Sequence, residues 1–172
     1  MSGGRAGRSG RAKSEGSILE VDAFAQTLHV GARLMGLDVG TKTIGVALSD
    51  VTRTIASGVT TLARGKFTVD AQRLLGLAEQ HGVGGFVVGL PVNLDGSEGP
   101  RAQATRAFAR NLAKVTAAPI LLWDERLSTA AAERTLLDAD MSRRRRAQVI
   151  DKVAATLILQ SALDRLRLLA AQ

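Results

Sequence analysis

The chain has 172 residues, of which 45% are hydrophobic and 23% charged, a composition typical of a folded globular domain rather than of a disordered chain. This length leaves room for one ordinary domain with a single core but not for two large ones. The formal charge of +7 favours a polyanionic partner such as nucleic acid, although basic proteins without such a ligand are also common.

The sequence contains no cysteine and only two histidines, His29 and His81, which stand in unrelated contexts. Disulfides and thiolate metal sites are therefore excluded, zinc is disfavoured, and any metal should be a hard cation held by oxygen ligands. No segment approaches the roughly 18 apolar residues of a membrane span, and the N-terminus lacks the apolar stretch of a signal peptide. We therefore expect a soluble, cytoplasmic protein without a membrane partner.

Residues 1–16 are almost entirely Gly, Arg, Ser and Ala, which predicts a flexible basic tail, either a nucleic-acid arm or a solvated segment without a role. Residues 17–33 form an extension in which apolar residues recur at helical spacing, so a short helix is expected there. The domain itself is expected over residues 34–172. Its first part predicts three antiparallel strands, at residues 34–39, 44–48 and 58–62.

The rest of the chain alternates helices and strands, which predicts parallel strands joined by crossover helices. The expected strands cover residues 85–90 and 120–123, and the expected helices cover residues 69–81, 100–115, 129–138 with Ser128 as N-cap, and 146–169. The sequence therefore predicts an α/β fold with a mixed five-stranded sheet, three antiparallel strands followed by αβαβ, flanked by helices.

Asp38 is the only charged residue in an apolar run that otherwise suits a buried central strand. A buried carboxylate is costly unless it is paired, hydrogen-bonded or bound to a metal, so Asp38 is a candidate site residue. An equally good interpretation is a turn-forming aspartate beside Gly40.

The strand at 120–123 also runs into acidic residues, Asp124 and Glu125. Because successive strand residues point to opposite faces, only one of the two is expected to face Asp38. The simpler alternative is that Asp124 and Arg126 merely end the strand.

Asp151 is the third candidate, near the start of the last predicted helix. Ala154 and Ala155 share its face, and small residues there would let the helix approach the strand ends. An aspartate early in a helix also favours the helix dipole, so this position alone does not decide.

Three such carboxylates could hold Mg²⁺ or Mn²⁺, the ions that activate water and stabilise the leaving oxygen at a phosphodiester. Basic residues nearby are candidates for phosphate contacts, which position a substrate without reading its sequence. They are Lys42, Arg126, Arg143, Arg144, Arg145 and Arg146. The arginine run could also be a solvated surface. With 3% aromatic residues, stacking on single strands is poorly supported, and duplex or junction backbone is favoured.

Four segments of the chain resemble the YqgF/RuvX family, a branch of the RNase H-like nucleases related to RuvC-type Holliday junction resolvases. They are GLDVGTKTIGVALSD from Gly36, VVGLPVNLDGSEGPRA from Val87, WDERLSTAAAE from Trp123 and DKVAATLILQ from Asp151. The resemblance implies an RNase H-like fold, with Asp38, Glu125 and Asp151 as metal-binding catalytic acids. It also implies a substrate-facing loop at residues 91–99, with Asn93 as its candidate contact.

The resemblance further implies a hydrolase that matures the 5′ end of pre-16S rRNA in ribosome biogenesis, with Holliday junction resolution in DNA recombination as a competing role. Junction cleavage would need paired active sites and hence a homodimer. One departure stands out: resolvases of the RuvC type have an acid at the end of the strand that here reads Gly89, Leu90, Pro91. The metal site is therefore expected to be assembled differently or to bind metal less tightly.

Two other functions remain open at this stage. Asp38, Gly40 and Thr41 also resemble the phosphate loop of actin-like ATPases and sugar kinases, but those enzymes close two domains around ATP and this chain has room for one. The other is a non-catalytic RNA-binding assembly factor that kept the fold, which the sequence does not exclude.

Overall fold

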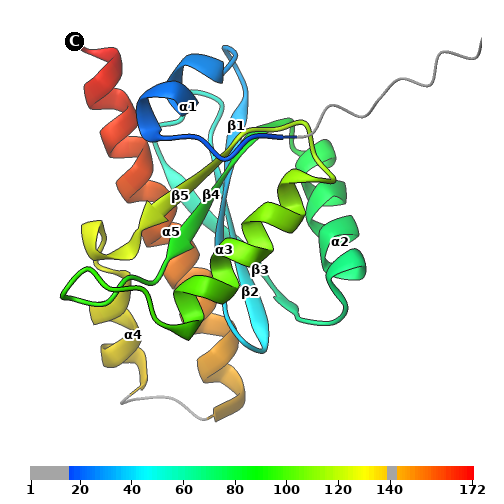
Figure 1. Ribbon diagram of the computed structural model, residues 1–172, viewed down its shortest axis with the longest axis vertical. Coiled ribbons are helices and arrows are strands. Elements are labelled where there is room, and N and C mark those ends of the chain that lie inside the picture. The colour runs from blue at the N-terminus through cyan, green and yellow to red at the C-terminus, as the bar shows by residue number, and fades with distance from the viewer. Residues whose placement is uncertain (1–15, 139–142) are drawn as a thin grey trace, which may run out of the picture.

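The computed structural model describes residues 16–138 and 143–172, and its centre is a five-stranded sheet in the order β3-β2-β1-β4-β5 (Figure 1). β1 (Arg33–Val39) pairs antiparallel with β2 (Thr43–Ser49), which pairs antiparallel with β3 (Ala56–Ala63). On the other side of β1, β4 (Val83–Leu90) and then β5 (Ile120–Asp124) are added in parallel. The predicted mixed α/β sheet is confirmed.

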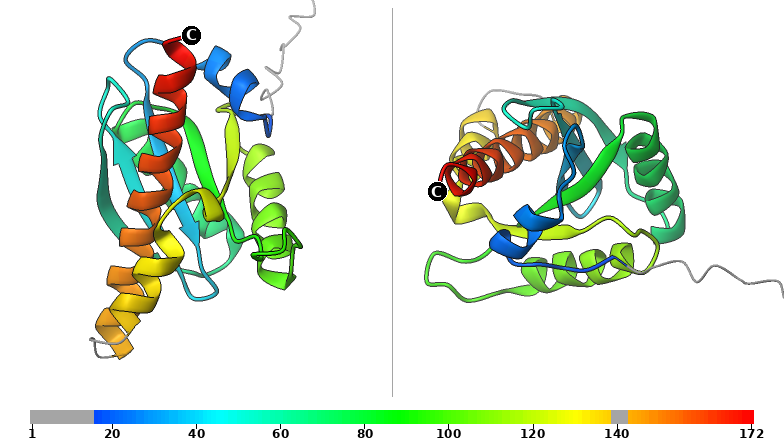
Figure 2. Two further views of the ribbon diagram at one scale, coloured as in Figure 1. Left: turned by 90° about the vertical axis from the view of Figure 1, so that its left-hand side faces the viewer. Right: turned by 90° about the horizontal axis from the view of Figure 1, so that it is seen from above.

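Helices cover both faces of the sheet (Figure 2). α2 (Phe67–Gln80) and α3 (Pro100–Ala113) pack on one face, and the long α5 (Arg143–Ala170) packs on the other. Beside α5 lie α1 (Val21–Thr27) and α4 (Ala130–Asp138), the latter joined to β5 by the short 3-10 helix η1 (Glu125–Leu127). In the part of the chain that the structure describes, no helix combines the length and apolar character needed to span a membrane.

The element boundaries differ from the predicted ones at two points near the site. η1 takes up residues that the sequence pattern assigned to no element, and α4 begins one residue later than predicted. α5 begins at Arg143, three residues earlier than predicted. The predicted tail, apart from Gly16, lies outside the described residues.

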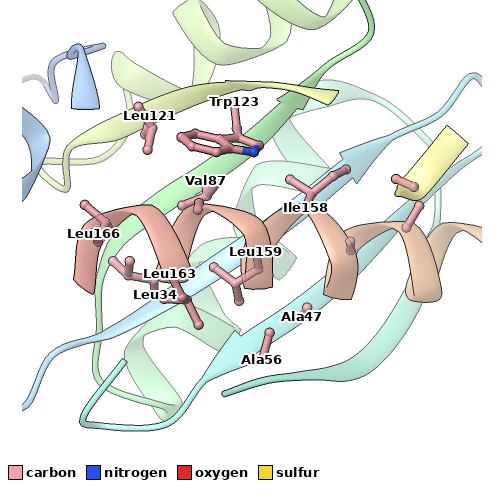
Figure 3. Close-up of a cluster of buried hydrophobic side chains, with 14 of the residues drawn as sticks. Leu34, Ala47, Ala56, Val87, Leu121, Trp123, Ile158, Leu159, Leu163 and Leu166 are labelled. Atoms are coloured by element: carbon pink, nitrogen blue, oxygen red, sulfur yellow. The ribbon is translucent and has the colours of Figure 1, made fainter. Parts of the chain in front are cut away.

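The sheet separates two hydrophobic cores, and the period of two along β1 decides which residues enter each. Leu34 belongs to the core under α5, whereas Met35 and Leu37 belong to the core under α2 and α3. In the α5 core, Ile158 and Leu159 pack with Val87, Trp123 and their neighbours (Figure 3). Asp38, an even position like Leu34, therefore lies on the α5 face.

α5 approaches the strands closely because glycines on the sheet leave room for it. A Cβ on Gly45 of β2 would overlap the backbone carbonyl of Asp151, and one on Gly36 of β1 would lie 2.7 Å from Cβ of Leu159. The alanines expected to allow this approach, Ala154 and Ala155, are buried in the same contact. Small residues on both partners thus bring Asp151 to the strands that carry Asp38.

Candidate active site

Asp38 and Glu125 lie at the edge of the sheet where the parallel strands end. Parallel strands present their carboxyl ends at one edge, which is where open α/β sheets usually bind ligands. Asp38 is the last residue but one of β1, and Glu125 follows directly after β5; they are 2% and 6% exposed. Figure 1 shows α4, the beginning of α5 and the loop after β4 at this same end of the molecule.

Arg134 of α4 lies between these two acids. Its Nη2 donates to Asp38 Oδ1 at 2.7 Å and to Glu125 Oε1 at 3.1 Å, and its Nη1 donates to Glu125 Oε2 at 2.9 Å. Burial lowers the pKa of Arg134, but the two carboxylates outweigh this and raise it overall, so the guanidinium stays charged. Arg134 could not be recognised from the sequence, because nothing in a chain rich in arginine marks this one as the partner of two distant acids.

Asp151 completes the group from α5. Thr43 at the start of β2 donates its hydroxyl to Asp151 Oδ2, and the side chains of Asp151 and Asp38 are hydrogen-bonded to each other. Burial and the negative charge of Asp38 raise the pKa of Asp151 to about 7. Burial also raises the pKa of Asp38, in opposition to the Arg134 guanidinium, which lowers it. Burial therefore disfavours a negative charge on both of these carboxyl groups.

Asp151 lies eight residues after the first residue of α5, in its third turn. The dipole of a helix acts mainly within its first and last turns, so the alternative of a dipole-stabilising aspartate loses its basis. The earlier start of α5 is the reason for this correction.

Gly89 accounts for the departure from the resolvase pattern. β4 runs between β1 and β5, and a Cβ on Gly89 would lie 2.5 Å from Cδ1 of Ile158 and 3.0 Å from Oε1 of Glu125. The space that a side chain at this position would fill is thus taken by the Glu125 carboxylate, which reaches over β4 from β5. An acid at position 89 would collide with it.

Asp124 points away from this group, as the alternation along β5 requires. Arg126 holds it through its backbone N–H at 2.9 Å and through Nη2 at 2.7 Å. Hydrogen bonds from the Arg126 side chain lower the pKa of Asp124. Asp124 and Arg126 thus end the strand, as the simpler alternative had it, while Glu125 faces Asp38.

The residues predicted to contact phosphate differ in exposure and in their hydrogen-bond partners. Lys42 is exposed in the turn between β1 and β2, whereas Asn93 donates Nδ2 to Ser97 Oγ at 3.0 Å and so closes its own loop. The side chains of Arg143, Arg144, Arg145 and Arg146 lie outside the described residues. Arg101 in the first turn of α3, which the sequence analysis missed, lies near enough for its charge to lower the pKa values of Asp38 and Asp151.

The sequence profile of a known family covers the whole of this arrangement. The profile of the RuvX family, described as Holliday junction resolvase, matches residues 32–165. The chain belongs to the RuvX family. The membership inferred from the four motifs is confirmed, and it favours this family over the phosphate-loop alternative.

Close relatives support the same assignment of this RuvX-family chain. A protein of Rhodopseudomonas palustris (strain TIE-1) is 64% identical over 149 residues, which cover 87% of this chain and 93% of the relative. One of Paracoccus denitrificans is 61% identical over 149 residues, covering 87% of this chain and 94% of the relative. Both carry the name "Putative pre-16S rRNA nuclease".

The RuvX-family chain also shares its fold with a solved structure, that of the yeast mitochondrial Holliday junction resolvase, Ydc2. The two align with a TM-score of 0.50 over 88% of this chain and 86% of the other, at 10% sequence identity. At that identity the likeness concerns the fold alone. The predicted RNase H-like fold is confirmed.

The donor set of this RuvX-family site suits a hard divalent cation. In residues 16–138 and 143–172, no three acidic or histidine side chains stand in a ready metal-binding arrangement. Asp38, Glu125 and Asp151 nevertheless supply the carboxylate oxygens that Mg²⁺ and Mn²⁺ prefer, and Arg134 occupies the space between two of them with a positive charge. The ligand chemistry of the three residues therefore fits such an ion.

Proposed function

We propose that this RuvX-family protein is a metal-dependent endonuclease that hydrolyses phosphodiester bonds at the 5′ end of pre-16S rRNA, in the cytoplasm. The observation that carries the proposal is the convergence of Asp38, Glu125 and Asp151, from three distant parts of the chain, at one edge of the sheet. The shared name of the relatives supports the choice of substrate.

The three acids share one role in this proposal, which is to hold the metal ion. Asp38, Glu125 and Asp151 would hold Mg²⁺ or Mn²⁺, which when bound supplies an activated water and stabilises the charge on the leaving oxygen. Thr43 holds the Asp151 carboxyl group toward Asp38 through its hydroxyl. Deprotonation of Asp151 as the pH rises through about 7 makes this carboxylate a better metal ligand.

Substrate positioning falls to basic residues at the same edge. Lys42 and Arg101 are exposed and close to the acids or to the strands that carry them, so we assign them to the phosphate backbone. The run Arg143 to Arg146, at the start of the helix that carries Asp151, is assigned there too. Arg126 is already held by Asp124, and its charge also acts on Asp95 of the loop at residues 91–99, so its role is to hold the loop.

The test is cleavage of a pre-16S rRNA fragment and of a four-way DNA junction, in Mn²⁺ and in EDTA. We compare the wild type with Asp38→Asn and with the matched control Asp124→Asn. Metal-dependent cutting of the rRNA that Asp38→Asn abolishes and Asp124→Asn retains is the expected result. Equal cutting by the wild type and Asp38→Asn, or none by either, would contradict it, and the latter would favour the non-catalytic assembly factor.

Junction resolution is the second candidate, and the description of the family profile favours it. In the same assay, preferential cutting of the DNA junction would identify it. Sedimentation of the protein provides an independent check, because paired incisions require a homodimer.

A further inference from the structure

Arg134 makes its described side-chain hydrogen bonds to two buried acids. All three go to Asp38 Oδ1 or to the two carboxylate oxygens of Glu125, at 2.7 to 3.1 Å. The Arg134 side chain is 22% exposed, and the side chains of Asp38 and Glu125 are 3% and 7% exposed. The flat fork of arginine suits such a bidentate contact, which an ammonium group could not reproduce.

The cluster of buried acids requires a positive charge close to it. Asp38 and Glu125 are nearly free of solvent, Asp151 lies against Asp38, and burying such groups without a counter-charge is strongly unfavourable. Arg101 acts on the same acids but is exposed to solvent, where its charge is screened. Arg134 is therefore the main internal compensation for the negative charge of the group.

We propose that Arg134 is the resident counter-ion of this site and must leave before a divalent cation can bind there. The inference rests on the proposed function in taking Asp38 and Glu125 as the metal ligands. Arg134 occupies one oxygen of Asp38 and both oxygens of Glu125, and a divalent ion bound to the same carboxylates would place a second positive charge close to the guanidinium in a poorly solvated place, which is unfavourable. Arg134 thus lets the protein fold without metal and sets how tightly metal is held.

The position of Arg134 on α4 also allows its displaced side chain to turn toward solvent. α4 packs against α5 through the buried Ala130, so the helix holds the base of Arg134 while the long side chain can turn toward solvent. A freed guanidinium at the edge of the site is a bidentate ligand for a phosphate group. Metal binding would then add a positive contact for the substrate.

The test is a titration with Mn²⁺ in the absence of nucleic acid, in which binding is measured through the EPR signal of the free ion. Replacing the charge by a neutral polar group, in Arg134→Gln, is expected to tighten Mn²⁺ binding by roughly 10–100-fold, the scale on which neighbouring side chains tune metal affinity. Arg134→Lys keeps the charge but loses the fork, so a smaller gain is expected. The matched control is Arg126→Gln, which removes another arginine that makes a two-point contact with a carboxylate and should leave the affinity unchanged.

Thermal unfolding supplies the second readout. Arg134→Gln should unfold at a lower temperature than the wild type in EDTA and recover most of the difference in saturating Mn²⁺. A purely structural ion pair would lower the unfolding temperature in both conditions without tighter binding. Unchanged or weaker Mn²⁺ affinity in folded Arg134→Gln overturns the proposal, and if that variant does not fold in EDTA, unchanged affinity in Arg134→Lys does so.

The two proposals fail separately. Adding Asp38→Asn to Arg134→Gln should cancel the gain in affinity, because the ion loses a ligand that the proposal requires. If no variant cuts nucleic acid yet Arg134→Gln binds Mn²⁺ more tightly, the counter-ion stands and the nuclease proposal falls. Cleavage that depends on Asp38, with Mn²⁺ affinity independent of Arg134, would support the nuclease and overturn the counter-ion.

Discussion

Arg126 and Arg134, at this end of the molecule, each donate hydrogen bonds to carboxylates, but their surroundings differ. Arg126 holds Asp124 at 2.7 Å with side chains 38% and 27% exposed, and Arg134 holds Asp38 at the same distance with side chains 22% and 3% exposed. The pKa of Asp124 is lowered by its arginine, whereas burial raises the pKa of Asp38 in spite of Arg134. Burial, rather than the presence of an arginine partner, therefore decides whether the pKa of the acid is raised or lowered.

Two acids that are adjacent in the sequence thus lie in different environments. Asp124 and Glu125 follow each other at the end of β5, yet one ends a strand in solvent and the other lies in the acidic group. An exposed pair contributes at most about 1 kcal/mol, whereas breaking a buried one by removing a partner costs about 3–5 kcal/mol. The same substitution made in each of the two pairs therefore compares an exposed with a buried acid–arginine contact.

The largest contrast is expected from Glu125→Gln and Asp124→Asn. Under the proposed function, Glu125→Gln should lower the rate of cleavage by about 100-fold or more, because a charged group at the reacting centre is lost. Asp124→Asn should keep the rate and change the free energy of unfolding by no more than about 1 kcal/mol. Single-turnover cleavage and urea denaturation of both variants measure this; similar rates in the two would break the contrast.

Gly89→Ala tests whether the buried pair depends on the missing side chain of β4. The new methyl group would collide with Ile158 and with the Glu125 carboxylate, so a loss of about 1–3 kcal/mol in the free energy of unfolding is expected. Gly76→Ala in α2 is the control, since nothing lies within 4 Å of its Cβ and alanine favours the helix by about 1 kcal/mol. Chemical denaturation should therefore show opposite signs, and a neutral Gly89→Ala would contradict the crowding described for Glu125.

The pH dependence of stability should also have opposite signs for the two kinds of acid. The pKa of Asp151 is raised from 3.8 to about 7 in the folded protein, so its contribution is full below pH 4 and is lost as the pH rises to about 7. The pKa of Asp124 is lowered, so its smaller contribution is present above pH 4 and is lost as the pH falls.

Unfolding temperatures in EDTA between pH 3 and 8 measure both effects. Asp151→Asn should remove part of the decline toward pH 7, and Asp124→Asn should remove part of the decline toward acid. A wild-type profile that Asp151→Asn leaves unchanged would mean that this carboxyl group is not perturbed.

The smallest effects are expected for single phosphate contacts. Lys42→Ala and Arg101→Ala should each weaken binding to unrelated nucleic acids alike and reduce the slope of log affinity against log salt by about 1. Arg126→Ala should leave the slope unchanged, because Asp124 already neutralises it. Replacing Arg143 to Arg146 by alanine should flatten the slope further, and an unchanged slope would remove that run from the interface. Filter binding over a range of salt concentrations distinguishes these cases.

The fold could be predicted from local patterns because each element carries its own period. Alternation along β1 and the repeat of apolar residues along α5 are properties of short stretches, and they decide which side chains meet the core. The boundaries were less certain: η1 and the early start of α5 depend on how β5 and the helices meet, which no local stretch encodes.

The sequence by itself determined the family and the sheet and indicated the three acids as candidates, since four long motifs are readable residue by residue. Only the tertiary structure decided that Glu125 reaches over Gly89, that Asp151 lies against Asp38, and that Arg134 stands between two buried carboxylates. The reason is physical: the need for a counter-charge in a buried site is a property of the assembled core. Any of the many arginines could meet it, and the packing of α4 against α5 selects one.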